Sequence, residues 1–308
     1  MYPVDLTTVL AGLTLRNPVV TGSGTYGFGE EYAAYCPLEA LGGITLKGIT
    51  PLPRLGNAVP RLAETPAGLL NAIGLENPGL EEFLKSYLPK IRQMPTAVIA
   101  NISGFSLEDY EQMARALQAD SGLAALEVNI SCPNVKHGGM HFGADPQSAE
   151  EVIAVVKEAT DLPVIAKLSP NVTDIVEIAC AVQRGGADAI SLINTLLGMQ
   201  IDIEQQRPLL ANTFGGLSGP AVRPVAVRMV WQVFEAVDLP IIGMGGITTW
   251  QDAVEFLLAG ATAISIGTGN FVNPQAPLEV LQGITTYCEK HGLISVRELV
   301  GLAHKIKQ

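Results

Sequence analysis

The sequence is poor in charged residues, and basic residues are the scarcer of the two kinds. Charged residues make up 16% of the 308 positions and hydrophobic residues 48%, whereas disordered chains combine few apolar residues with much charge. The 19 Lys and Arg are scattered singly against 30 Asp and Glu, which gives a net charge of −11. Nucleic acids and anionic membranes are bound through clustered basic residues. We therefore expect a folded protein that binds neither.

Cysteines and long apolar segments are also rare. The four cysteines are too few and too far apart for a disulfide framework or a CxxC metal site, which favours a reducing compartment. Residues 1–5 contain neither a basic segment nor a long apolar run, so we expect no secretory signal. The longest uncharged stretch, residues 256–278, is interrupted by glycine, asparagine and proline, whereas a membrane span needs about 20 predominantly apolar residues. We expect a cytoplasmic protein.

Eight short apolar runs, each ending at small or polar residues, recur along the chain. They occupy residues 18–20, 43–46, 97–100, 125–128, 163–166, 189–193, 240–242 and 263–266. Segments with helical spacing of apolar residues lie between them, at 108–117, 148–160, 173–184, 222–237 and 249–259. Asp145 and Thr173 are candidate N-caps of the second and third of these helices.

This alternation predicts an α/β fold, a single (β/α)8 TIM barrel that spans residues 1–308. Short continuous apolar strands that alternate with helices form parallel sheets buried on both faces. An open doubly wound sheet would need a full glycine fingerprint after the first strand, and residues 21–24 hold only a fragment of one. The connections that contain residues 49–78 and 196–220 are about twice as long as the others. Both follow carboxyl ends of strands, so we expect long binding loops there rather than surface decoration.

Two glycine-rich turns follow the last two runs, at residues 243–246 and 267–269. Glycine leaves backbone N–H groups accessible, and many barrels hold a phosphate at this place. Tight turns that need glycine for their conformation alone are the alternative. Because two matched turns occur together, we favour a phosphate site.

The other strand ends carry lysines and polar side chains that a barrel would project inward. Neutral amides suit the edge of a planar heterocycle, although asparagine is also a common turn former. A buried ammonium needs an anion, and a flavin together with an anionic substrate would supply one for each lysine. These residues are Lys47, Asn101, Asn129, Lys167, Asn194 and Thr195.

Cys132 directly follows the fourth run, and its loop continues through residues 135–139, which could place the thiol over the barrel mouth. Packing is the alternative, and it is what we expect of the other cysteines, Cys36, Cys180 and Cys288. A Cys132–His137 nucleophile is disfavoured because no acyl-transfer feature accompanies it. We expect surface positions and no metal site for His141, His291 and His304, which lack metal-ligand spacing.

Taken together, these motifs resemble class 1 dihydroorotate dehydrogenases over nearly the whole chain. The segments that carry the resemblance are 45–48, 71–79, 129–134, 167–171 and the two glycine turns. The loops at Asn71 and Cys132 are similar to those of the NAD-linked class 1B catalytic subunit. The resemblance implies oxidation of dihydroorotate to orotate in de novo pyrimidine biosynthesis, with one FMN per chain. It also implies a homodimer core in a heterotetramer, with a partner subunit that carries FAD and a [2Fe-2S] cluster and passes electrons to NAD+.

The same resemblance assigns roles to individual residues. Cys132 becomes the catalytic base, whereas class 2 enzymes have serine there and an N-terminal membrane anchor. Glu76 departs from the family pattern, in which glutamine is expected. The implied FMN contacts are Ser23, Lys47, Gly48, Asn101, Asn129, Lys167, Ile193, Gly219, Gly245, Gly246, Gly267 and Thr268. The implied substrate contacts are Lys47, Asn71, Ala72, Ile73, Gly74, Leu75, Asn129, Asn194 and Thr195.

Other functions fit parts of this pattern. A class 1A enzyme would pass electrons to fumarate without a partner, and another FMN barrel could act on a different dihydropyrimidine. A phosphosugar-binding barrel would use the glycine turns without redox chemistry. A non-catalytic scaffold would require the inward asparagines and lysines to be accidental.

Overall fold

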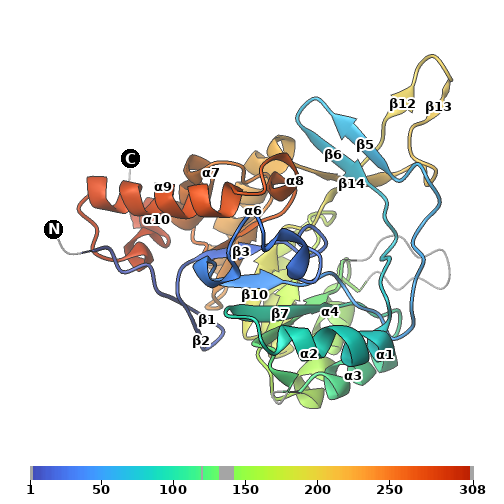
Figure 1. Cartoon of the computed structure of the whole chain (residues 1–308), viewed down its shortest axis with the longest axis horizontal. Helices are drawn as coiled ribbons and strands as arrows, with labels where there is room; N and C mark the ends of the chain where they lie inside the picture. The colour runs from blue at the N-terminus through green and yellow to red at the C-terminus, as the bar shows by residue number, and fades with distance from the viewer. Residues whose placement is uncertain (1–2, 119–120, 132–141, 306–308) are drawn as a thin grey trace.

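Eight parallel strands form a closed barrel, which confirms the predicted architecture. The computed structural model describes residues 3–118, 121–131 and 142–305. Around the barrel each strand pairs with the next in sequence, and β16 closes the ring onto β3 (Figure 1). Each strand lies within, or overlaps, one predicted apolar run. The strands are β3 (Val19–Thr21), β4 (Gly43–Thr45), β7 (Ala97–Ile102), β8 (Ala125–Asn129), β9 (Val164–Lys167), β10 (Ala189–Leu192), β15 (Ile241–Met244) and β16 (Ala263–Ile266).

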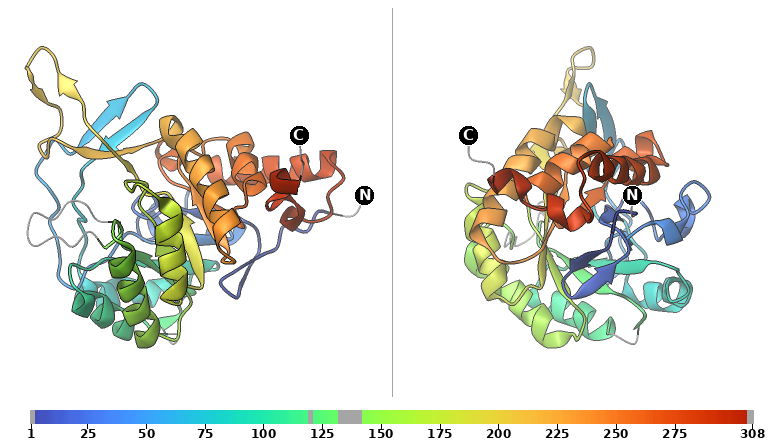
Figure 2. Two further views of the ribbon diagram at one scale, coloured as in Figure 1. Left: turned by 180° about the vertical axis from the view of Figure 1, so that it is seen from behind. Right: turned by 90° about the vertical axis from the view of Figure 1, so that its left-hand side faces the viewer.

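Helices surround the barrel, as both views in Figure 2 show. The five predicted helical segments correspond to α3 (Leu107–Ala116), α4 (Pro146–Ala159), α5 (Ile175–Arg184), α6 (Arg223–Ala236) and α7 (Trp250–Leu258). Further elements are η1 (Glu30–Tyr32), η2 (Leu38–Ala40), α1 (Leu80–Glu82), η3 (Phe83–Tyr87), α2 (Leu88–Ile91), η5 (Pro220–Val222), α8 (Gly269–Val272), α9 (Ala276–Lys290), η6 (Val296–Leu299) and α10 (Leu302–Lys305).

One of the two predicted N-caps is wrong. The Asp145 side chain accepts a hydrogen bond from the Ser148 N–H at 2.8 Å and caps α4 as expected. Helix α5 is capped by Asp174 instead of Thr173, because the Asp174 carboxylate accepts from the Val176 N–H at 2.8 Å. Both residue types cap well, so composition alone does not separate two adjacent candidates.

A short hairpin closes the amino-terminal end of the barrel. It consists of β1 (Thr8–Leu10) and β2 (Leu13–Leu15), and its Leu10 and Leu15 are buried. They pack with side chains from inside the barrel, including those of Val20, Ile165 and Ile242. This apolar layer leaves the opposite, carboxyl end of the barrel for a binding site.

The two long connections, which we expected to be long binding loops, contain strands that pair with each other. They form an antiparallel sheet that protrudes beyond the barrel at the upper right of Figure 1. The first connection supplies β5 (Leu62–Thr65) and β6 (Gly68–Asn71), and the second supplies β11 (Leu196–Gly198) and β14 (Gly215–Ser218). The strand order is β11-β14-β6-β5, and a hairpin of β12 (Ile201–Asp202) and β13 (Arg207–Pro208) extends from it.

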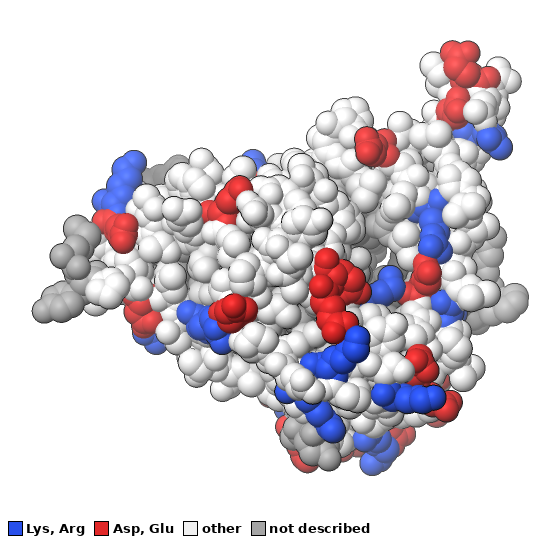
Figure 3. Space-filling model, viewed as in Figure 1, with Lys and Arg blue, Asp and Glu red and all other residues white. Residues whose placement is uncertain are grey.

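The surface carries charges of both signs side by side on the face seen in Figure 3. Within residues 3–118, 121–131 and 142–305, none of the helices has the length and apolar character required to cross a membrane.

Candidate active site

A cavity of about 410 Å³ lies at the carboxyl end of the barrel. Its floor includes Asn101, Asn129 and Lys167 at the ends of β7, β8 and β9, and its roof includes Leu69 and Leu217 of the protruding sheet. Figure 3 shows the molecule hollowed between the barrel and this sheet. The fold thus brings together residues almost 250 positions apart in sequence.

The residues expected to contact FMN all line this one cavity. They are Ser23, Lys47, Gly48, Asn101, Asn129, Lys167, Ile193, Gly219, Gly245, Gly246, Gly267 and Thr268. Of the remaining residues expected to contact substrate, Asn71, Ile73, Gly74, Leu75, Asn194 and Thr195 line it too. Their contacts with ligands stay predictions, and what the structure shows is that these residues converge on one cavity.

Ala72 is the exception among the expected contacts. Side chains alternate along β6 and the residue after it, so that Leu69 and Asn71 line the cavity whereas Leu70 and Ala72 pack with Leu210 on the other face. The Ala72 backbone is also engaged, because its N–H donates to the Arg61 carbonyl and its carbonyl accepts from Asn57 Nδ2. Ala72 therefore supports the sheet from behind the cavity.

Cys132, the expected catalytic base, lies outside the described residues, and so do His137 and His141. The chain leading to Cys132 reaches the cavity, since Asn129 and Ser131 both line it. Ser131 is fixed there, because its N–H donates to Asn129 Oδ1 at 3.1 Å and its hydroxyl donates to the Lys167 carbonyl at 3.0 Å. The role of Cys132 stays a prediction.

The asparagines at the mouth are held in place by other polar groups. Asn194 Nδ2 donates to Asn129 Oδ1 at 3.4 Å, and Tyr110 Oη donates to the Asn129 carbonyl at 2.8 Å. Asn171, which the sequence analysis did not single out, donates from Nδ2 to the Thr195 carbonyl at 2.9 Å and itself lines the cavity. Side chains restrained in this way can present amides to a ligand without first being ordered.

Glu127 is the most unexpected polar residue of the site. It lies on β8, only 1% exposed, and its carboxylate contacts three side chains. Asn101 Nδ2 donates to Oε2 at 2.6 Å, Ser191 Oγ donates to Oε1 at 2.8 Å, and Lys167 Nζ lies 3.5 Å from Oε2. A charged residue inside an otherwise apolar run was the sequence signal that could have revealed it.

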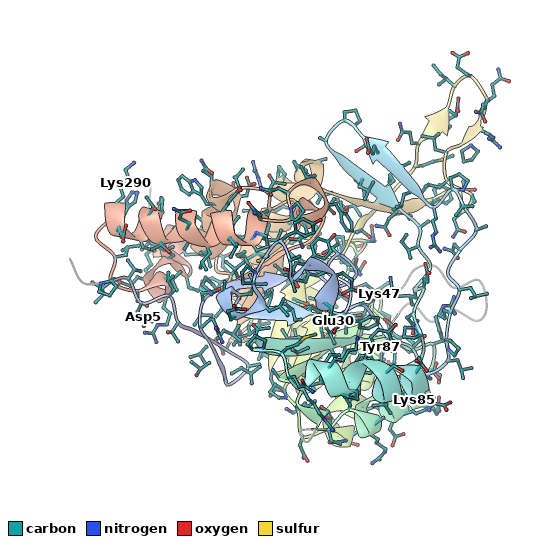
Figure 4. The ribbon with its side chains drawn as sticks, viewed as in Figure 1. Asp5, Glu30, Lys47, Lys85, Tyr87 and Lys290 are labelled. Carbon is teal, nitrogen blue, oxygen red and sulfur yellow. The ribbon has the colours of Figure 1, made fainter. Side chains whose placement is uncertain are left out.

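Lys47 lies at the cavity wall just after β4, and Figure 4 labels it. Burial lowers its pKa below the ordinary value of 10.5, Glu76 raises it, and Arg61 lowers it further. Among the charged groups that the structure describes, no carboxylate forms an ion pair with Lys47, since Glu76 pairs with Arg61. An anionic ligand would supply the missing counter-charge.

The two glycine turns differ in what requires glycine. Gly245 and Gly246 have φ angles of 125° and 80°, and a Cβ at Gly246 would lie 2.7 Å from the Gly219 carbonyl oxygen, so the backbone conformation itself requires glycine there. At Gly267 the nearest atom to an added Cβ is Thr25 Cγ2 at 4.0 Å, so a side chain there would extend into the cavity. Beside the turn, Thr268 Oγ1 donates to Ser218 Oγ at 2.6 Å.

Two buried oxygens facing this region have no hydrogen-bond partner among the described atoms, Asn101 Oδ1 and Ser265 Oγ. Both residues line the cavity. Buried polar atoms are seldom left unsatisfied, so these two indicate a polar ligand. Together with the glycine turns, they fit a cofactor that has both a heterocycle and a phosphate.

Comparison with known proteins agrees with this geometry. The sequence model of one family, described as dihydroorotate dehydrogenase, matches residues 5–287. The chain belongs to the dihydroorotate dehydrogenase family. A curated relative from Desulforamulus reducens is 57% identical over 301 residues, which are 98% of this chain and 99% of the relative. Another from Desulforudis audaxviator is 56% identical over 98% of both chains. A third from Geobacter sulfurreducens is 53% identical, covering 98% and 99%.

All three relatives are named "Dihydroorotate dehydrogenase B (NAD(+)), catalytic subunit". In this dihydroorotate dehydrogenase family member, Cys36 and Cys288 are buried, as expected for packing residues, and Cys180 is partly buried. Burial raises the pKa of the Cys36 and Cys288 thiols, which disfavours the reactive thiolate.

The two histidines within the described residues differ from each other. His291 is exposed, as predicted. The surface position predicted for His304 is wrong, because its ring stacks on Trp231 with 3.4 Å between centroids and its side chain is only 13% exposed. It packs between helices far from the cavity.

Proposed function

We propose that this chain oxidises dihydroorotate to orotate in pyrimidine biosynthesis, as the catalytic subunit of an NAD-linked enzyme. The observation that supports this most is the set of groups around the cavity, a cation at Lys47 and side-chain amides at Asn71, Asn129 and Asn194. Dihydroorotate has one carboxylate and a ring with amide groups, which are the partners that such side chains recognise. The names of the relatives indicate the same substrate.

The proposal includes one FMN per chain, bound within a single barrel domain of a cytoplasmic protein. Asn101, Asn129 and Lys167 would hold the ring system, and the turns at 243–246 and 267–269 would hold the phosphate. The unpartnered Asn101 Oδ1 and Ser265 Oγ support this assignment. When bound, FMN supplies the acceptor for the hydride that leaves the substrate.

The chain's own residues would bind the substrate, remove a proton and balance charge. Lys47 would pair with the substrate carboxylate, and the three asparagines would orient the ring. Cys132 would take the proton from the ring carbon next to the one that loses hydride. Lys167 would stabilise the negative charge that develops in the cavity.

Orotate binding should weaken as the pH rises through the pKa of Lys47. Burial lowers that pKa, so in the absence of orotate Lys47 loses its proton at a lower pH than an ordinary lysine, whose pKa is 10.5. If only the charged form pairs with the carboxylate, the dissociation constant should rise about tenfold for each pH unit above that pKa. Titrations of the holoenzyme with orotate from pH 7 to pH 11, above the ordinary lysine pKa of 10.5, would measure this, and a profile that stays flat over that whole range would remove Lys47 from the carboxylate site.

For the electron acceptor, we propose a partner subunit that carries FAD and a [2Fe-2S] cluster, on a homodimer core in a heterotetramer. The name "catalytic subunit" of the relatives supports a partner. Large apolar side chains are also exposed on the connections that follow β4, β10 and β16, among them Leu55 (95% exposed), Ile203 (80%) and Val272 (80%), and a partner would cover such side chains.

The acceptor profile of the purified chain, alone and with its partner, tests this function. With dihydroorotate as donor, we expect NAD+ reduction only when the partner is present, and little reduction of fumarate by either preparation. Fumarate reduction by the isolated chain at the full rate would instead establish the class 1A alternative. Failure of dihydroorotate to reduce any acceptor would refute the oxidation itself.

A further inference from the structure

Glu127 has no assigned part in the reaction described above, yet it is a nearly inaccessible carboxylate beneath the cavity floor. Burying a carboxylate is costly unless it is paired and hydrogen-bonded. Here each oxygen has a partner, and the partners come from three different strands: Asn101 from β7, Lys167 from β9 and Ser191 from β10. Two of these partners, Asn101 and Lys167, line the cavity, whereas Glu127 does not.

Sheet register explains how one carboxylate reaches three strands. Glu127 lies directly opposite Asn101 in the β7–β8 pair and directly opposite Ile165 in the β8–β9 pair. Lys167 lies on β9 two residues after Ile165. Ser191 in turn lies opposite Lys167. Residues two apart on a strand have side chains on the same face, so the side chains of Glu127 and its three partners meet in the interior of the barrel.

The chemistry of the carboxylate fixes which way the Asn101 amide points. An ionised carboxylate only accepts hydrogen bonds, so the group that faces it at 2.6 Å must be the Asn101 NH2. The Asn101 oxygen is then turned away. It is buried without a partner among the described residues, and it lies where a Cβ on cavity-lining Gly48 would approach it to 2.7 Å.

We propose that Glu127 is a positioning residue: its carboxylate orients Asn101 so that the amide oxygen accepts from a ligand N–H or O–H, and it holds the Lys167 ammonium at the cavity wall. Glu127 acts only through these two residues. The inference rests on the proposed FMN cofactor, whose ring system carries an N–H donor. In this proposal Glu127 determines whether Asn101 presents a hydrogen-bond donor or an acceptor to the ligand.

The test measures the FMN dissociation constant by flavin fluorescence for apoprotein of the wild type and of matched variants. Glu127→Gln keeps the shape but can donate as well as accept, so it no longer fixes the amide. We expect FMN to bind up to about tenfold more weakly, the effect of one lost hydrogen bond between neutral groups. Asp188→Asn is the control, since Asp188 precedes β10 at the far end of the barrel and pairs with Lys157. It should leave FMN affinity unchanged.

A second pair of variants measures the pH dependence of FMN affinity, which would not change if Glu127 only filled space in the core. In Asn101→Asp two carboxyl groups face each other and repel when both are ionised, so they share one proton, and FMN affinity should fall as rising pH removes it. In the double variant Asn101→Asp with Glu127→Gln, the glutamine amide donates to the new carboxylate, and this pH dependence should disappear. Lys167 is the other titratable group of the cluster, and it is common to all variants.

The outcomes separate the two proposals. If the wild-type chain does not bind FMN, the proposed function fails. If the wild type binds FMN but Glu127→Gln binds it equally well, Glu127 is not a positioning residue. The same conclusion follows if the pH dependence of Asn101→Asp persists in the double variant. Should Asn101→Asp not fold, which circular dichroism would reveal, the comparison of Glu127→Gln with Asp188→Asn still decides.

Discussion

Replacing Cys132 by alanine should lower dihydroorotate oxidation near neutral pH by about 10²–10⁴-fold, the usual contribution of a positioned acid or base. FMN should stay bound, because the expected cofactor contacts come from the strand ends and glycine turns instead. An ordinary thiol has a pKa of about 8.5, so only a small fraction is thiolate at pH 7. Wild-type activity should therefore rise with pH, and the residual activity of the variant should lack that rise.

Cys180→Ala is the matched control for this experiment. Cys180 lies on α5 and is partly buried, and it does not line the cavity. Turnover in this variant should match the wild type. Stopped-flow reduction of the flavin by dihydroorotate would measure the chemical step in each protein. Full activity of Cys132→Ala would show that another group takes the proton.

Replacing Lys47 by methionine should weaken orotate binding by about 10- to 150-fold. Methionine fills a similar volume without the charge, and a hydrogen bond to a charged group contributes about 1.5–3 kcal/mol. Dihydroorotate should show a matching rise in KM. The pH dependence of orotate binding expected for the wild type should vanish as well, because the variant lacks the ammonium whose lowered pKa causes it.

Lys85→Met provides the comparison for charge removal. Lys85 is exposed on η3, and Figure 4 shows it on the outside of the molecule, away from Lys47. Its loss should leave orotate affinity unchanged. Spectral titration of the bound flavin with orotate measures both variants. Equal affinity of Lys47→Met and the wild type would mean that the carboxylate binds elsewhere.

The barrel was predictable because its strands are buried on both faces and therefore form continuous apolar runs. The protruding sheet was not. Strands β5 and β6 are half exposed, with no apolar run to mark them, and β6 pairs with β14 from a connection about 145 residues later. Pairing between segments so distant depends on barrel closure, which brings both connections to one end, and local sequence does not encode it.

Lys47, the inward asparagines, Lys167 and the glycine turns were predictable from their position at strand ends, whereas the remaining expected contacts came only from the family resemblance. Ala72 was expected at the ligand because the motif names consecutive residues, whereas strand geometry turns alternate side chains to opposite faces and packs Ala72 behind the cavity. Glu127 was missed because it lies within a run that otherwise reads as a buried strand. Its burial is tolerable only after Lys167 and Asn101 arrive from neighbouring strands.

The most direct measurement of the central claim is an anaerobic titration of the purified chain with dihydroorotate. We predict that the visible flavin absorbance bleaches in proportion to added dihydroorotate, with one orotate formed per FMN reduced. A flavin that dithionite reduces but dihydroorotate does not, at any pH between 7 and 9, would contradict the proposed reaction.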